Sequence, residues 1–131
     1  MTGVLGIRGT AITPNGEIAD GLVTVEAGKI KYVGRWEDDR CDRLLDFRGS
    51  YVAPGLVDIH VHGGGGHGAM DPEGIGGLSE FLSRGGVTSY LPTTHTAPHD
   101  RIVEAAMAIG RGVRGGVSGA IPLGIHMEGP Y

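Results

Sequence analysis

Apolar and polar side chains alternate in short stretches over residues 1–53, and turn-forming residues separate these stretches. Alternation with a period of two is typical of β-strands, and no stretch in this part shows the spacing of an amphipathic helix. The segment GLVTVEAGKIKYVG predicts a hairpin that reverses at Ala27–Gly28, and a further turn is expected at Arg48–Gly49. Residues 1–53 are therefore predicted to form a small all-β unit that frames the rest without carrying chemistry.

The pattern changes at Pro54–Gly55, after which strand-like and helix-like stretches alternate. Asp71–Pro72 predicts the start of a first helix, delayed by the glycines that follow, and PHDRIVEAAMAIGRG predicts a second helix. This alternation indicates an α/β fold with a parallel sheet, whose strands are normally buried on both faces. The predicted strands cover residues 56–62, 87–92 and 121–127, a recurrence that matches the size of a βα unit.

Two histidines end the first predicted strand, in the stretch VAPGLVDIHVHGGGG. Side chains two residues apart in a strand lie on the same face, which places the Cα atoms of His60 and His62 about 7 Å apart. Imidazoles in this arrangement can bind one metal ion, but they can equally be hydrogen-bonded or solvated. The pair alone leaves both interpretations open.

A carboxylate at the end of the third predicted strand favours metal binding over the other interpretation of the two histidines. In IPLGIHMEGPY, apolar side chains alternate with a second set that ends in Glu128. The carboxyl ends of parallel strands lie at one edge of a sheet, so Glu128 is expected at the same edge as His60 and His62. A divalent ion would also offset the cost of burying that carboxylate, so metal binding becomes the favoured interpretation.

The composition limits the classes of protein to which the chain can belong. With 131 residues, 40% of them apolar, it is long enough for one modest globular core. Its 26 glycines show no collagen period, so they indicate turns and close backbone contacts. A net charge of −4 argues against a nucleic-acid partner, and no apolar run is long enough to cross a membrane. Because Cys41 is the single cysteine, a reducing, cytoplasmic location is expected.

Three stretches carry a family resemblance. PGLVDIHVHGGGG resembles the metal-binding signature of the amidohydrolase superfamily, and GIHMEGPY is similar to a motif of the N-acetylglucosamine-6-phosphate deacetylases. GVTSYLPTTHT, residues 86–96, resembles the second barrel strand of that family. The resemblance covers essentially the whole chain but about the first third of a family member. It implies that residues 1–53 belong to a small β-sandwich and that residues 54–131 form the first three βα units of a (β/α)8 TIM-type barrel, truncated at Tyr131.

The resemblance also implies a site and an activity. His60 and His62 would bind one metal and Glu128 would bind or bridge, with one or two divalent ions, zinc or iron being favoured. The complete protein would be a homodimer or higher oligomer that deacetylates N-acetylglucosamine 6-phosphate to glucosamine 6-phosphate and acetate. The family's aspartate general base and its later histidine ligands have no counterpart here, so residues 1–131 alone are expected to be inactive and prone to associate. Two alternatives remain: a hydrolase of cyclic amides, like dihydroorotase or hydantoinase, and a non-catalytic metal-binding remnant.

Several nearby residues have both a functional and a structural interpretation. The glycine tract is expected to be a flexible active-site loop rather than a phosphate cradle, with Gly63, Gly64 and His67 near the substrate. Asp58 is expected to orient a histidine or to bond neighbouring backbone, and His126 to lie behind the ligands or in the packing. The structural interpretation is preferred for the others: Thr93, Thr94 and His95 end the second strand, His99 and Asp100 begin a helix, and Met107 and Met127 lie in the core.

Overall fold

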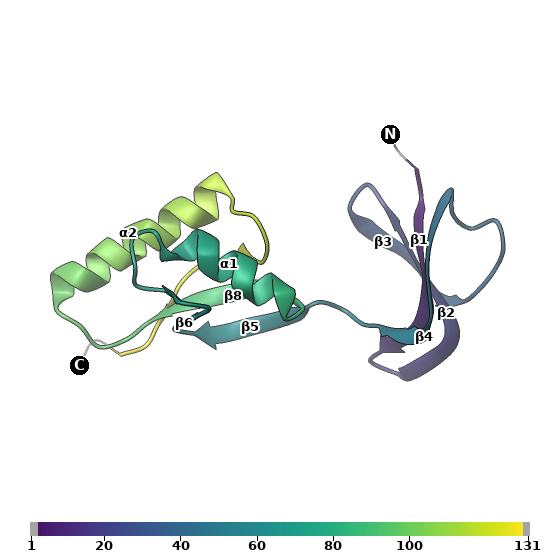
Figure 1. Ribbon diagram of the computed structural model, residues 1–131, viewed down its shortest axis with the longest axis horizontal. Coiled ribbons are helices and arrows are strands. Elements are labelled where there is room, and N and C mark those ends of the chain that lie inside the picture. The colour runs from purple at the N-terminus through teal and green to yellow at the C-terminus, as the bar shows by residue number, and fades with distance from the viewer. Residues whose placement is uncertain (1–2, 130–131) are drawn as a thin grey trace. The chain divides into compact units, whose positions relative to one another are not determined.

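The computed structural model describes residues 3–129 of the chain (Figure 1). The chain divides into two compact units with the bounds Met1–Pro54 and Gly55–Tyr131, and each has its own sheet. No helix among residues 3–129 combines the length and the apolar character that crossing a membrane requires.

The first unit is one four-stranded sheet with the order β3-β2-β1-β4. β1 pairs antiparallel with β2 and β2 with β3, whereas β4 lies parallel to β1. The predicted all-β character is confirmed, because the described residues before Pro54 contain strands and turns without a helix. The strands are β1 (Leu5–Thr13), β2 (Gly16–Glu26), β3 (Lys29–Arg35) and β4 (Arg43–Val52).

The two predicted turns of this unit have different outcomes. The hairpin between β2 and β3 reverses at Ala27–Gly28 as predicted, and both residues have the positive φ angles, 48° and 73°, of a tight two-residue turn. The turn predicted at Arg48–Gly49 is wrong, because β4 continues through both residues. The glycine there, with φ of 86°, instead accompanies a register shift between β4 and β1.

The second unit alternates strands and helices around a parallel sheet with the order β10-β8-β5, and β9 also pairs with β8. Both helices contact β8, and Figure 1 shows them on the same side of the sheet. The α/β character predicted for this part of the chain is confirmed. Its elements are β5 (Leu56–Val61), β6 (Gly63–Gly64), β7 (His67–Gly68), α1 (Gly74–Arg84), β8 (Val87–Thr94), α2 (His99–Gly115), β9 (Ile121–Pro122) and β10 (His126–Met127).

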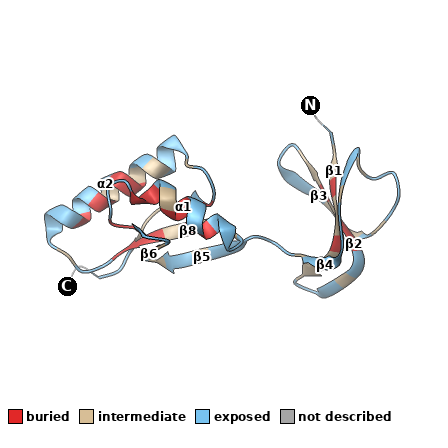
Figure 2. Ribbon diagram, in the orientation of Figure 1, coloured by how far each residue is buried: buried red, intermediate tan, exposed pale blue. Residues whose placement is uncertain are grey.

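The core of the second unit lies between α1 and β8, where Figure 2 shows buried residues on the facing sides of both elements. Leu78 and Tyr90 are fully buried there, and Val61 of β5 packs against the same cluster. Burying a leucine side chain contributes about 1.5–3 kcal/mol, so this cluster anchors the end of β5 that carries the histidines. The Tyr90 hydroxyl is bonded to the Ser79 hydroxyl at 2.8 Å, which satisfies both groups inside the core.

The predictions for the two helices and for two methionines have mixed outcomes. The first helix begins at Gly74, later than Asp71–Pro72 as the glycines predicted, but Asp71 does not cap it, because its carboxylate accepts the Gly68 N–H. The second helix begins at His99 with Asp100 in its first turn, as predicted. The prediction that Met107 and Met127 lie in the core is wrong, because they are 61% and 60% exposed.

The strands also differ from the predictions in extent and burial. β8 continues to Thr94, so Thr93 and Thr94 are buried residues of the strand and do not lie past it, and the strand ends two residues later than predicted. The third predicted strand is broken into β9 and β10 by the residues between them. Burial of the parallel strands on both faces is wrong for β5, because Val57 and Ile59 are 59% and 65% exposed.

Candidate metal centre

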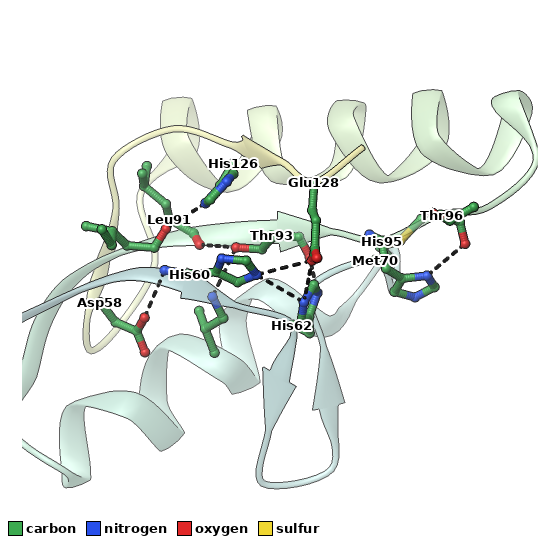
Figure 3. A network of polar contacts seen from close by, with 12 residues as sticks. Asp58, His60, His62, Met70, Leu91, Thr93, His95, Thr96, His126 and Glu128 are labelled. Carbon is green, nitrogen blue, oxygen red and sulfur yellow. Dashed lines mark hydrogen bonds and ion pairs between the residues drawn. The ribbon is translucent and has the colours of Figure 1, made fainter. Parts of the chain in front are cut away.

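Three side chains from two strand ends converge at one edge of the parallel sheet (Figure 3). His60 comes from β5, His62 from the residue after it, and Glu128 from the residue after β10. The Nε2 atoms of His60 and His62 lie 3.2 Å apart. Glu128 Oε2 lies 3.2 Å from His60 Nε2 and 2.8 Å from His62 Nε2. The structure therefore brings together the three residues that the sequence singles out as ligands.

The strand alternation explains the direction of the two histidines. Val61 packs toward the helices in the buried cluster, so its neighbours on either side, His60 and His62, point to the opposite face. Their side chains are each 44% exposed, and that of Glu128 is 51% exposed. The centre is thus accessible from solvent, as a site that receives a substrate must be.

Backbone hydrogen bonding fixes the tautomer of His62. Its Nδ1 atom lies 3.2 Å from the carbonyl oxygen of Thr93, and a carbonyl can only accept a hydrogen bond. Nδ1 of the neutral ring therefore carries the proton, and the lone pair of Nε2 faces the other two groups. Behind metal-binding histidines a carbonyl commonly plays this part.

These residues fit a divalent cation. Two imidazole nitrogens and a carboxylate oxygen are the donor types that zinc, iron and manganese share. Ligands at about 2.0–2.1 Å in a tetrahedral arrangement are roughly 3.3 Å from one another, close to the separations found between His60, His62 and Glu128. With His62 Nε2 and the carboxylate both acceptors, a shared cation satisfies all three groups at once.

Two further side chains lie directly behind the three converging groups. Asp58 accepts a hydrogen bond from the backbone N–H of His60 at 3.0 Å, so it bonds neighbouring backbone, which is one of the two predicted possibilities. His126 donates from Nδ1 to the carbonyl of Ile59 at 2.8 Å, and its ring contacts that of His60 edge-on with 4.6 Å between centroids.

The residues predicted to lie near the substrate form a hairpin over α1. Gly63 and Gly64 of β6 pair with β7, in which His67 lies. A Cβ atom on Gly64 would meet Phe81, and one on Gly77 would meet the imidazole of His67, so the close packing on α1 requires glycine at both places. His67 therefore lies against the helix, whereas Gly63 directly follows His62.

Thr93 is the residue whose importance the sequence did not reveal. It is fully buried, its hydroxyl accepts the N–H of Val61 at 3.0 Å, and its carbonyl holds His62. His95 lies two residues further on, with its ring centroid 6.1 Å from that of His62 and its backbone N–H directed at the sulfur of Met70. The usable signal was Pro92, because proline in a predicted central strand marks a bulge where side chains replace backbone hydrogen bonds.

The chain is similar to known sugar-phosphate deacetylases. No family model matches the chain. Over 115 residues it is 35% identical to an N-acetylglucosamine-6-phosphate deacetylase from Vibrio furnissii, covering 86% of the chain and 29% of that protein. Over 82 residues it is 43% identical to an N-acetylgalactosamine-6-phosphate deacetylase from Escherichia coli O157:H7, covering 61% of the chain and 22% of that protein.

A solved structure extends the likeness to the whole chain. It is a variant of N-acetyl-D-glucosamine-6-phosphate deacetylase from Mycobacterium smegmatis in complex with N-acetyl-D-glucosamine-6-phosphate. The likeness has a TM-score of 0.78 at 26% identity and covers 100% of this chain and 34% of that one. The chain therefore spans about a third of the length of the relatives it matches.

Proposed function

We propose, from the premise that this chain is a relative of the N-acetylglucosamine-6-phosphate deacetylases within the amidohydrolases, that it carries the metal-binding portion of a carbohydrate N-deacetylase. The reaction is the hydrolysis of N-acetylglucosamine 6-phosphate to glucosamine 6-phosphate and acetate by the full-length protein. Residues 1–131 alone are proposed to be inactive.

The observation that carries the proposal is the convergence of His60, His62 and Glu128, with 2.8–3.2 Å between their donor atoms. Two neutral imidazoles and one carboxylate hold a divalent cation while leaving it net positive charge. We assign these three side chains as its ligands, for one or two ions, with zinc or iron preferred.

The residues of this chain would bind and orient rather than transfer protons. A divalent cation held there supplies Lewis-acid polarisation of the acetamide carbonyl. His62, fixed by Thr93, and His60, whose backbone is fixed by Asp58, keep their Nε2 atoms toward Glu128. Gly63, immediately after His62, is proposed to let the substrate approach the backbone. The general base is proposed to be an aspartate from elsewhere in the full-length protein.

The fold belongs to the same proposal. Residues 54–131 are assigned to the first three βα units of a (β/α)8 barrel, and residues 1–53 to part of a β-sandwich. The parallel pairing of β5, β8 and β10, with α1 and α2 on one side, supports the barrel assignment. Their ligand-bearing ends would then form part of the catalytic face of the barrel.

Location and assembly are also proposals. A free thiol at Cys41, the single cysteine of the sequence, suits the reducing cytoplasm. Exposed apolar side chains at Ile59, Ile121 and Met127 need cover, which the rest of the protein and association into a homodimer or higher oligomer would provide.

The experiment measures acetate release by the full-length protein together with its metal content. N-acetylglucosamine 6-phosphate is compared with N-acetylgalactosamine 6-phosphate, with unphosphorylated N-acetylglucosamine, and with dihydroorotate and hydantoin as cyclic amides. We expect turnover of the first substrate, its loss after chelation and its return with zinc, iron or manganese. If the protein hydrolyses dihydroorotate or hydantoin instead, it is a cyclic-amide hydrolase and the deacetylase proposal is wrong. If it binds metal but turns over none of these substrates, it is a non-catalytic metal-binding remnant.

A further inference from the structure

The central strand of the parallel sheet contains a proline just before the metal centre. Pro92 has no N–H, so it cannot donate a hydrogen bond to a neighbouring strand. β5 carries one more residue than β8 over the matching stretch, because Asp58 pairs with Tyr90 but Val61 pairs with Pro92. This is a β-bulge on the strand that bears the histidines.

A matching one-residue offset lies on the other side of β8, at the break between β9 and β10. Pro122 of β9 pairs with Tyr90, whereas His126 of β10 pairs with Thr93, so the third strand also carries one extra residue there. Both neighbours of β8 are therefore out of regular register close to the three side chains: the irregularity on β5 contains His60 and precedes His62, and the one on the third strand precedes Glu128. Bulges re-aim the side chains that follow them, and they are common beside active sites.

Two side chains replace the missing backbone pairing. The hydroxyl of Thr93 accepts the N–H of Val61 at 3.0 Å and donates to the carbonyl of Leu91, also at 3.0 Å. The imidazole of His126 reaches from β10 and donates its Nδ1–H to the carbonyl of Ile59 on β5 at 2.8 Å. Between them, these bonds hold the backbone on both sides of His60, as the dashed contacts in Figure 3 show.

We infer that Thr93 and His126 are positioning residues that lock the bulge of β5 and the offset between β9 and β10 so that His60, His62 and Glu128 converge. The inference rests on the proposed metal site. Thr93 acts twice, because its hydroxyl holds the backbone before His62 and its carbonyl orients the ring of His62. His126 acts by tying the third strand to the first and by supporting the ring of His60 edge-on.

The test uses substitutions that separate hydrogen bonding from packing. Thr93→Val keeps the shape of the side chain and removes the hydroxyl, whereas Thr93→Ser keeps the hydroxyl. His126→Leu removes the donor, whereas His126→Asn keeps an amide donor near the position of Nδ1. Each variant of the full-length protein is stripped of metal, its thermal unfolding is recorded, and its zinc affinity is measured by competition with a chromophoric chelator.

We expect Thr93→Val and His126→Leu to weaken zinc binding by about 10–100-fold, as loss of a residue behind a metal ligand commonly does, and Thr93→Ser and His126→Asn to recover most of the affinity. Wild-type affinity in Thr93→Val and His126→Leu would overturn the inference. So would equal losses in Thr93→Ser and Thr93→Val, since packing would then be the cause. If Thr93→Val does not fold, the two His126 variants decide by the same comparison. A wild-type protein that binds no zinc would instead contradict the proposed metal site itself.

Discussion

The carboxylates of the two units are neutralised in different ways. In the first unit, Asp20 lies 2.7 Å from Arg8, Asp46 lies 2.8 Å from Arg48, and Glu37 pairs with Arg40. In the second unit, Glu128 faces the Nε2 atoms of His60 and His62, which carry no fixed charge. Three acidic side chains of the first unit are therefore paired with arginines of the same unit, whereas Glu128 lies with two imidazoles that can share the proposed cation with it.

The arrangement of polar side chains indicates the functional site better than the number of charged residues does. The first unit has more ion pairs, yet an arginine held by a carboxylate is an ordinary surface interaction that contributes little. The converging side chains of the second unit are few, but each directs a ligand atom to the same point. The contrast teaches that a site is marked by ligand atoms that converge on one point and not by the number of charged residues.

Glu128→Gln should have the largest effect, because the amide keeps the shape but lacks the charge that binds the cation. In the full-length protein we expect acetate release to be nearly abolished, a greater loss than the roughly 10–100-fold typical of residues behind a ligand, and bound metal to fall. The double variant His60→Asn with His62→Asn should lose about one ion and keep measurable activity, since Glu128 would remain as a ligand. Metal analysis by plasma emission beside an acetate assay measures both.

A surface carboxylate of the same unit provides the control for that experiment. Glu104 pairs with Arg101 on α2 in the manner of the first unit, so Glu104→Gln should leave metal content and turnover unchanged. Full metal content and near-normal turnover in Glu128→Gln would make Glu128 an equally ordinary carboxylate and would remove the distinction between the two units.

A second pair of variants tests whether the metal centre depends on its own unit alone. Leu78 and Leu22 are both fully buried, one in the second unit and one in the first. Replacing either with alanine should cost about 2–5 kcal/mol of stability, because a cavity remains in a packed core. Leu78→Ala should also weaken zinc binding, since Leu78 supports Val61 between the two histidines.

Leu22→Ala should destabilise without changing the affinity of the folded protein for zinc. Thermal unfolding and chelator competition on the two variants measure the two quantities separately. Equal losses of zinc affinity in Leu22→Ala and Leu78→Ala would mean that the metal centre depends on the first unit as well, which would contradict the prediction.

The sequence predicted the elements better than their local irregularities. Period-two alternation before Pro54 and βα spacing after it gave the correct class for both parts of the chain. The predictions were wrong at Arg48–Gly49, at the break between β9 and β10, and in the capping of α1 by Asp71. In each place the outcome depends on a neighbouring segment, such as the shifted pairing of β4 with β1, that a single strand or helix pattern does not contain.

The candidate ligands were predictable because strand ends define a common edge. His60, His62 and Glu128 could be placed together from alternation and parallel order alone. The hydroxyl of Thr93 and the reach of His126 to Ile59 could not, because they compensate for a register shift whose position only three-dimensional pairing reveals. Met107 and Met127 were wrongly predicted to lie in the core, because an apolar residue in the sequence does not show whether another helix or strand covers it.

Tyr90→Phe tests the core of the second unit at alkaline pH, and its expected effect on stability is smaller than that of the leucine variants. Burial raises the pKa of Tyr90, against the opposing effect of its bond with Ser79. A group whose pKa is raised on folding contributes stability that is present below its unfolded value, about 10, and lost as pH rises through the folded value. Tyr90→Phe should remove that alkaline loss while costing about 1–3 kcal/mol at neutral pH, because the Ser79 hydroxyl loses its partner. Urea unfolding at pH 7 and above pH 10 measures this, with exposed Tyr51→Phe as the control that should change neither; an unchanged alkaline loss in Tyr90→Phe would contradict it.

Acid should act on the first unit with the smallest effect of all. Hydrogen bonds from Arg8 and Arg48 hold the pKa values of Asp20 and Asp46 below their ordinary range. A carboxylate whose pKa is lowered on folding contributes stability that is present above its unfolded value and lost as pH falls through the folded value, which here means below about pH 4. Asp20→Asn should therefore reduce the acid sensitivity of the first unit only slightly, because the pair is solvent-screened, and 1 M salt should reduce the remaining difference from wild type at neutral pH.

Tryptophan fluorescence reports on this unit specifically, since Trp36 is the single tryptophan of the sequence and its ring lies 4.2 Å from the Arg8 guanidinium. An acid transition that moves as far in Asp46→Asn as in Asp20→Asn would fit two independent surface pairs, whereas a large shift from either one alone would mean that the first unit, too, relies on a single carboxylate.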